Sequence, residues 1–207
     1  MTVASRSKPA SLDEKRVLDA AFRTLDAHGF SGLTIRRIAD ELGVKNPALY
    51  WHFKNKQEII DGMAGRLLDN MTTGDGETPD NWRVWLEEAA QLYRRALFSV
   101  RDGAEVLSNA NLSRSRHFAE FSRHIEFFIS QGFTTRDATV GMVTVFNYTL
   151  GMTYEQQADA NLAVQIDAAD RTLVAPMGVT RVDIARDELF KSGLEVILDG
   201  LALRHRS

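Results

Sequence analysis

Cysteine is absent from the 207 residues, which excludes disulfide bonds and thiolate metal sites. Proline is scarce, with four residues, and no stretch approaches the roughly 18 apolar residues that a membrane-spanning helix needs. The first ten residues are polar and include Arg6 and Lys8, so they lack the apolar segment of a secretory signal. Together these absences predict a cytoplasmic protein without a membrane segment.

Charge is unevenly distributed along the chain, although the net charge is only −3. Up to Lys56 there are 10 Lys and Arg against 6 Asp and Glu, whereas the remainder has 15 against 22. A basic N-terminal part on an acidic body suits DNA docking at one end of the molecule. Chance also produces such unevenness, so charge alone leaves both interpretations open.

Apolar residues recur at helical spacing almost everywhere, and no alternating run is long enough for a sheet, which predicts an all-α fold. A capping box formed by Ser11 and Glu14 is expected to begin the first helix, and Gly29 to end it. Further helices are expected at about 35–42, 47–53, 56–70, 82–100, 104–109, 115–131, 135–163 and 183–203. The segments 72–81 and 167–180, which contain glycine and proline, are predicted to be loops.

Two of these helices, 35–42 and 47–53, are short and are joined by a turn that contains Gly43, which is typical of a helix-turn-helix. Leu49 and Phe53 are four residues apart and form the expected buried side of the second helix. The other side of that helix is aromatic and polar, which is costly unless it meets a partner.

A helix-turn-helix places its second helix in the DNA major groove while the first helix braces it across the backbone. Asn46 is then a candidate for reading a base edge, and Ala48 for contacting a thymine methyl group. The candidates for phosphate contacts are Tyr50, His52 and Lys56, with Thr34 and Arg36 from the bracing helix. Spacing alone also allows a three-helix bundle with an incidental aromatic cluster.

The same segment resembles the DNA-binding domain of the tetracycline-repressor (TetR) family. The resemblance lies in Leu33-Thr34, Leu42-Gly43-Val44 and the run from Pro47 to Lys56, which reads PALYWHFKNK. It implies an all-helical homodimer that binds operator DNA. The operator-contacting positions that it implies are Arg36, Lys45, Asn46, Pro47, Ala48, Tyr50, Trp51, His52 and Lys56.

The resemblance extends to the core domain of the tetracycline repressors that give the family its name. It includes Tyr93–Leu97, Arg101–Ala104 and Thr149–Gly151. In those repressors a magnesium ion chelated by the drug is held through a His on a short central helix, and the matching position here is Leu107. A leucine cannot ligate a hard cation, so neither a metal site nor binding of magnesium-tetracycline is expected.

The expected effector is a small hydrophobic or aromatic molecule, because the predicted pocket is mostly apolar with a few polar groups. The predicted lining is Tyr93, Leu107, Phe118, Phe121, His124, Phe128, Met142, Phe146, Asn147 and Glu155. Glu155 is retained at a position that helps to hold the magnesium in the family. The aromatic residues would equally fill an ordinary core. Two histidines, His117 and His124, without a carboxylate at ligand spacing do not indicate a metal site.

The predicted organisation is a disordered arm at 1–10, a helix-turn-helix domain at 11–56, and an effector-binding and dimerisation domain at 57–207. The helices at 135–163 and 183–203 are expected to pair with their symmetry mates. The expected protein is a ligand-responsive repressor whose homodimer binds a palindromic operator and is released by the effector.

Other interpretations remain open. The helix-turn-helix regulator could be an activator or a repressor gated by a protein partner, or could have no small-molecule effector. An enzyme is not expected, because no nucleophile–base pair, phosphate-binding loop or metal-ligand spacing is present.

Overall fold

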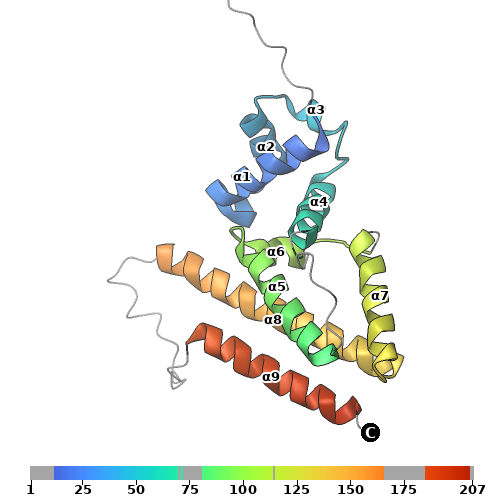
Figure 1. Cartoon of the computed structure of the whole chain (residues 1–207). Helices are drawn as coiled ribbons and strands as arrows, with labels where there is room; N and C mark the ends of the chain where they lie inside the picture. The colour runs from blue at the N-terminus through green and yellow to red at the C-terminus, as the bar shows by residue number, and fades with distance from the viewer. Residues whose placement is uncertain (1–11, 70, 72–80, 114, 166–184, 206–207) are drawn as a thin grey trace, which may run out of the picture.

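The computed structural model describes residues 12–69, 71, 81–113, 115–165 and 185–205. Within these ranges the chain forms helices and no strand, so the all-α prediction is confirmed. Figure 1 shows a small head above a larger body, with one helix leading from the head to the body. The predicted arm at 1–10 and the predicted loop at 167–180 lie outside the described residues. No helix in the described ranges is long and apolar enough to cross a membrane.

The first helix, α1 (Glu14–Gly32), starts at a different cap from the predicted one. The Oδ1 atom of Asp13 accepts a hydrogen bond of 2.8 Å from the backbone N–H of Arg16, so Asp13 is the N-cap. Serine and aspartate cap helices about equally well, which is why the capping box at Ser11 misled the prediction. Gly29 interrupts α1 with a φ of +69°, a left-handed conformation that glycine adopts without steric cost.

The second helix, α2 (Ile35–Leu42), has the predicted bounds. The hydroxyl of Thr34 accepts a hydrogen bond of 3.2 Å from the backbone N–H of Arg37 and caps the helix. Gly43 has a φ of +67° and lets the chain turn sharply after Leu42. The turn directs the chain into α3.

The third helix, α3 (Asn46–Leu49), is shorter than the predicted 47–53. Beyond Leu49 the chain continues as a hydrogen-bonded turn, in which the backbone N–H groups of His52 and Phe53 both donate to the Leu49 carbonyl oxygen at 3.0 Å. Because this turn keeps the helical direction, Leu49 and Phe53 both remain buried, as predicted.

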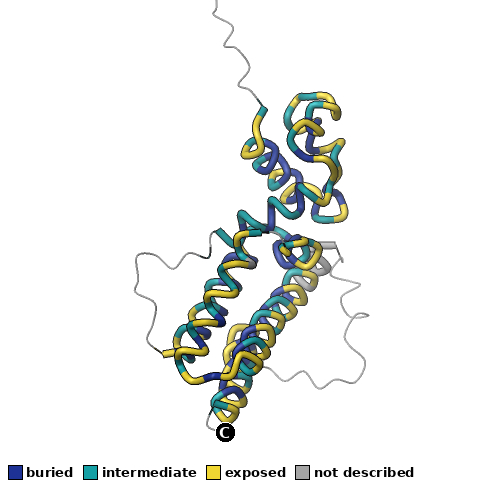
Figure 2. The backbone as a smooth tube through the Cα atoms, turned by 90° about the vertical axis from the view of Figure 1, so that its right-hand side faces the viewer, coloured by how far each residue is buried: buried dark blue, intermediate teal, exposed yellow. Residues whose placement is uncertain are grey.

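The remaining helices lie close to their predicted ranges. They are α4 (Lys56–Asp69), α5 (Trp82–Phe98), α6 (Gly103–Ser108), α7 (Arg116–Ser130), α8 (Thr135–Gln165) and α9 (Arg186–His205). In Figure 1, α4 descends from the head onto α5 and α6, α7 stands at one side of the body, and α9 runs beneath the long α8. Figure 2 shows that buried segments continue from the head into the body.

One hydrophobic core spans both the head and the upper body. Ile38 and Leu49 of the head belong to it, together with Met63 of α4 and Leu107 of α6. All four are less than a tenth exposed. These side chains form one packed cluster, so α6, α4 and the head share a single core.

A second core lies lower in the body and is rich in aromatic side chains. Trp82 packs edge-on against Phe133 with ring centroids 5.0 Å apart, and Phe128 is fully buried beside them. From α9, buried residues at helical spacing enter this core: Phe190, Leu194, Leu198 and Leu201.

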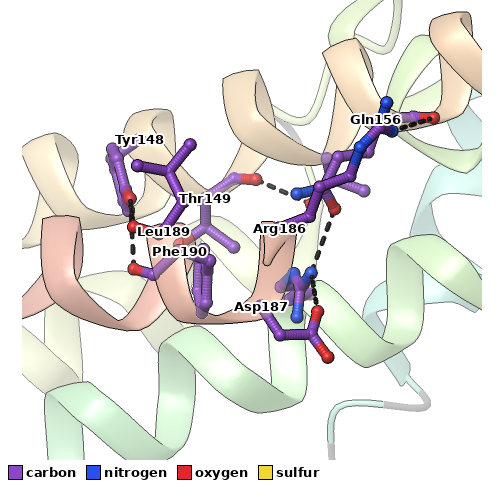
Figure 3. Close-up of polar contacts among 9 residues, drawn as sticks. Tyr148, Thr149, Gln156, Arg186, Asp187, Leu189 and Phe190 are labelled. Carbon is purple, nitrogen blue, oxygen red and sulfur yellow. Dashed lines mark hydrogen bonds and ion pairs between the residues drawn. The ribbon is translucent and has the colours of Figure 1, made fainter. Parts of the chain in front are cut away.

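Polar contacts fix the start of α9 on α8 and α5 (Figure 3). The hydroxyl of Tyr148 lies 3.2 Å from the Leu189 carbonyl oxygen and 3.1 Å from that of Phe190, both of which can accept from it. Arg94 donates to Asp187 at 2.7 Å and to the side-chain oxygen of Gln156 at 3.0 Å. Arg94 thereby holds the pKa of Asp187 below its ordinary value.

The junction between head and body lies where the break in α1 meets the loop before α6. Asp102 is 6% exposed, and its Oδ2 atom accepts a hydrogen bond of 2.8 Å from the backbone N–H of Phe30. Arg101, its neighbour, donates to the carbonyl oxygen of Asp26 at 2.8 Å. The loop is therefore tied to α1 by two consecutive residues.

The other side of this loop is held by α8. The side-chain amide of Gln157 donates to the carbonyl oxygens of Leu97 and Val100, each at 3.1 Å. Its oxygen accepts from the backbone N–H of Ala104 at 3.0 Å. Since backbone groups on both sides of the loop are satisfied by one half-buried amide, the start of α6 has a fixed position relative to α8.

Replacing Asp102 with Asn tests the junction. We expect Asp102→Asn to lower the free energy of unfolding by about 1–2 kcal/mol, because a hydrogen bond to a charged acceptor becomes a neutral one. Asn tolerates the left-handed backbone found at Asp102, where φ is +53°. Urea unfolding measures the change. Asp40→Asn, at a largely exposed carboxylate, is the control and should stay within about 0.5 kcal/mol. Equal effects of the two substitutions would contradict the assignment.

Two glycine-to-alanine substitutions should change the free energy of unfolding in opposite directions. A Cβ on Gly103 would lie 2.2 Å from the backbone oxygen of Leu97, so we expect Gly103→Ala to destabilise by about 1–3 kcal/mol. A Cβ on Gly65, inside α4, would meet no atom within 4 Å. Gly65→Ala should therefore stabilise by about 0.5–1 kcal/mol through helix propensity. Thermal unfolding of both variants checks the pair, and a neutral Gly103→Ala would refute the close approach.

Candidate nucleic-acid interface and ligand cavity

The surface around α3 presents the side chains that were predicted to contact DNA. Lys45, Asn46 and Pro47 are exposed at the start of α3, whereas Leu49 on its opposite side is fully buried. Trp51 is 88% exposed and Tyr50 54%. A tryptophan so exposed, beside polar side chains, is typical of a surface that is covered by a partner.

The flanks of this surface come from the bracing helix and from the turn after α3. Thr34 is exposed, and the side chain of Arg36 is 85% exposed, with its Nε atom 3.9 Å from Oδ2 of Asp40. Ala48 and His52 are half-buried. These side chains lie beside α3 in the chain and can extend a contact along a DNA backbone.

Lys56 is placed differently from the other predicted contacts. Its ammonium lies 5.2 Å from the centre of the Phe30 ring, a cation–π distance. It also opposes the rise in pKa that burial and Asp102 cause at Glu105. In this conformation Lys56 faces the junction between head and body, so its predicted phosphate contact would require the side chain to swing away.

A cavity of about 590 Å³ lies in the upper body, below the end of α4. It is bounded by α4, α5, α6, α7 and α8. Its lining is mostly apolar but includes the phenol of Tyr93 and five other titratable side chains, which are Glu88, His117, Glu120, Arg123 and His124. The full lining is Leu68, Met71, Trp85, Glu88, Ala89, Leu92, Tyr93, Leu107, Leu112, His117, Glu120, Phe121, Arg123, His124, Phe146 and Leu150. The volume and composition are those of small-molecule sites.

Half of the predicted pocket residues line this cavity, namely Tyr93, Leu107, Phe121, His124 and Phe146. Phe128 and Met142 do not, because both are fully buried in the second core. Asn147 and Glu155 are exposed on α8 outside the cavity lining. The side chain of Phe118 lies outside the described residues.

The predicted lining included only Tyr93 from α5 and missed most of the face that this helix contributes. Trp85, Glu88, Ala89 and Leu92 recur at three- and four-residue spacing, so they share one side of the helix with the cavity. That spacing was visible in the sequence. What it could not reveal was that this side of α5 faces a cavity rather than a filled core.

The inner cavity wall carries uncharged polar groups. Tyr93 is 7% exposed and packs edge-on against Phe146, with ring centroids 5.2 Å apart. Burial raises the pKa of the Tyr93 phenol, which therefore stays protonated. The ring of His124 lies 4.6 Å from that of Trp85, and burial lowers the pKa of the imidazole, with smaller opposing effects from Glu120 and Arg123.

A polar cluster borders the cavity between α4 and α7. His117 lies between two carboxylates, with Nε2 3.0 Å from Asp69 and Nδ1 3.1 Å from Glu120. Arg116 also pairs with Asp69. Because Asp69 ends α4, this cluster ties the end of α4 to the cavity wall.

The donor set of the cavity does not suit a magnesium ion. Leu107 is 8% exposed and supplies an apolar side chain to the wall from α6. Over the described ranges, no three His, Cys, Asp or Glu side chains are grouped so that they could hold a metal. Magnesium prefers a near-octahedral set of oxygen ligands.

Comparison with known proteins agrees with this architecture over nearly the whole chain. Residues 17–63 match the family described as "Bacterial regulatory proteins, tetR family", and residues 75–204 match "Tetracyclin repressor-like, C-terminal domain". The chain is 33% identical over 199 residues to the tetracycline repressor protein class A from transposon 1721 of Escherichia coli, covering 93% of this chain and 92% of that protein.

Solved structures with the same architecture include one bound to a drug and one bound to DNA. The structure of TetR (class A) in complex with 5a,6-anhydrotetracycline and magnesium is 31% identical, with a TM-score of 0.75, over 93% of this chain and 99% of that chain. The structure of BioQ with its double-stranded DNA operator is also 31% identical, with a TM-score of 0.71, over 93% and 99%. The chain therefore belongs to the TetR family of helix-turn-helix transcription regulators, with a C-terminal domain of the tetracycline-repressor type.

Proposed function

We propose that this protein is a ligand-responsive transcriptional repressor that acts in the cytoplasm. Its homodimer would bind a palindromic operator through α3 and leave it when a small apolar or aromatic effector enters the cavity. The observation that carries the proposal is the shared core: Leu49, beneath the exposed face of α3, and Leu107, in the cavity wall, belong to one packed cluster. Relatives that bind an operator or a tetracycline support it.

Two-fold pairing would be provided by α8 and α9. Val196 and Leu203 on α9 are 72% and 68% exposed, and Val140, Val143 and Tyr154 on α8 are each 43% exposed. Helices that keep so much apolar surface are typical of a subunit interface. A dimer with two reading heads about 34–36 Å apart fits half-sites one DNA turn apart.

The gating mechanism follows from linkage. An effector releases DNA only if it binds more tightly to a conformation in which the two heads are wrongly spaced. α4 is the lever, because it joins the head core to the cavity through Leu68 and to α7 through Asp69. A ligand that displaces Leu68 or α7 would shift α4, and the head with it.

The deciding experiment measures binding to the DNA beside the protein's own gene, titrated with aromatic compounds. Operator binding that one compound class abolishes would support the proposal, and light scattering of the same sample should give twice the mass of the chain. Binding that no compound changes would leave a DNA-binding regulator and point to a protein partner as the gate.

Base reading and phosphate contact can be separated by two neighbouring substitutions. We expect Asn46→Ala to weaken operator binding by about 1–3 kcal/mol and to have little effect on unrelated DNA, because a base contact is lost. Lys45→Ala should weaken both DNAs alike and lower the slope of log affinity against log salt by about 1. Fluorescence anisotropy at several salt concentrations measures both. If the two substitutions act alike on both DNAs, Asn46 does not read a base.

Magnesium-tetracycline should not act as the effector. We expect tetracycline with Mg²⁺ to leave the operator complex intact, because Leu107 supplies no ligand for the ion. A gel-shift titration with Mg²⁺, and in parallel with EDTA, provides the measurement. The class A tetracycline repressor serves as a positive control for the drug preparation. Release at the drug concentration that frees this control would refute the prediction.

A further inference from the structure

Tyr93 carries a polar group in the cavity that the protein leaves unused. Over the described part of the chain, no donor or acceptor pairs with its hydroxyl, although buried polar groups are nearly always hydrogen-bonded. Unpaired side-chain atoms sealed from solvent occur, in the same ranges, only on Arg94, Arg101 and Gln156. The Tyr93 hydroxyl therefore opens into accessible space, and the space that Tyr93 lines is the cavity.

His124, on α7 and packed against α5, provides a second polar group in the cavity without a hydrogen-bond partner among the described residues. Its ring packs against Trp85, and neither ring nitrogen is hydrogen-bonded to a described residue. Burial favours the neutral imidazole, which offers one donor and one acceptor. The charged side chains nearest to it, Glu120 and Arg123, have opposite signs and opposite effects on it.

No charged side chain contributes to the raised pKa of Tyr93, whereas Glu120 and Arg123 do act on His124. Glu88 and Arg123 are exposed, and Glu120 is paired with His117. The wall around Tyr93 is formed instead by aromatic and aliphatic side chains, including Phe146 and Leu107. An ion placed there would lose its hydration without gaining a counter-charge, so the inner part of a ligand must be uncharged.

We propose that the cavity recognises an aromatic molecule whose inner part is uncharged, through a carbonyl oxygen that accepts a hydrogen bond from the Tyr93 hydroxyl, without a metal ion. The ligand's rings would lie between the packed pair of Trp85 and His124 on one side and Phe146 on the other, where edge-on and stacked contacts are available. This inference rests on the proposed function in taking the cavity as the effector site. It goes further by naming the chemistry of the effector and the atom that selects it.

Xanthone and xanthene provide a matched pair of probes, because both are neutral tricyclic ethers and they differ at one carbon, a carbonyl in xanthone and a methylene in xanthene. We expect the full chain to bind xanthone about three- to tenfold more tightly than xanthene, as one hydrogen bond of ordinary strength would give. Equilibrium dialysis, with and without EDTA, measures both affinities. The preference should be the same in EDTA and in Mg²⁺.

Tyr93→Phe removes only the hydroxyl and should abolish the preference while retaining xanthene binding. Tyr154→Phe is the matched control: it removes a hydroxyl from an exposed tyrosine of α8 outside the cavity lining and should keep the preference. The comparison of the two probes on the unaltered protein does not depend on either variant. Equal affinities, binding of neither probe, a preference that survives Tyr93→Phe, or a requirement for Mg²⁺ would each overturn the inference.

Measuring operator release by xanthone in the same samples distinguishes the proposal about cavity chemistry from the proposal about effector gating. Tyr93-dependent binding without release would support the cavity chemistry and contradict the gating. Release of the operator by another compound, with no carbonyl preference in the cavity, would support the gating and contradict this inference.

Discussion

The fold depends on a hydrophobic core that crosses from the head into the body without a break. Leu49 holds the underside of α3, Met63 continues the packing along α4, and Leu107 ends it in the cavity wall. Close-packed side chains resist independent movement, so these three elements have few ways to shift separately. A head attached only by a flexible linker would have no such constraint.

Polar contacts complement this packing at the two places where helices could slide. Asp102 attaches the loop before α6 to the break in α1, and Gln157 attaches the same loop to α8. At the other end of α4, Asp69 meets His117 and Arg116 of α7. Packing provides the coupling, while directional hydrogen bonds determine which residues stay in register.

The same residue types have different roles in the two cores. Phe128 fills the lower core, where its ring packs against Trp82 and Phe133. Phe146 lies between the two cores and also lines the cavity. The cavity therefore lies at the boundary between the lower body, which carries the apolar faces of α8 and α9, and an upper body that is attached to the head.

Local sequence signals predicted the elements well wherever short-range physics decides them. Thr34 and Gly43 mark the two ends of α2, because capping and left-handed turns depend on a few neighbouring residues. The start of α1 shows the limit of this reasoning. Ser11 and Asp13 both suit an N-cap, and side-chain chemistry alone does not decide which of them caps the helix. The burial of Leu49 and Phe53 also followed from spacing alone.

The sequence by itself determined the all-helical fold, the helix-turn-helix and the exposed chemistry of α3, because these depend on periodicity and on contiguous residues. Only the tertiary structure decided which aromatic side chains line the cavity and which fill a core. Phe121 and Phe128 lie seven residues apart on α7, yet one borders the cavity and the other is sealed behind Trp85 and Trp82. The physical reason is that helical spacing sets the direction of a side chain, whereas the space in front of it is made by residues distant in the chain.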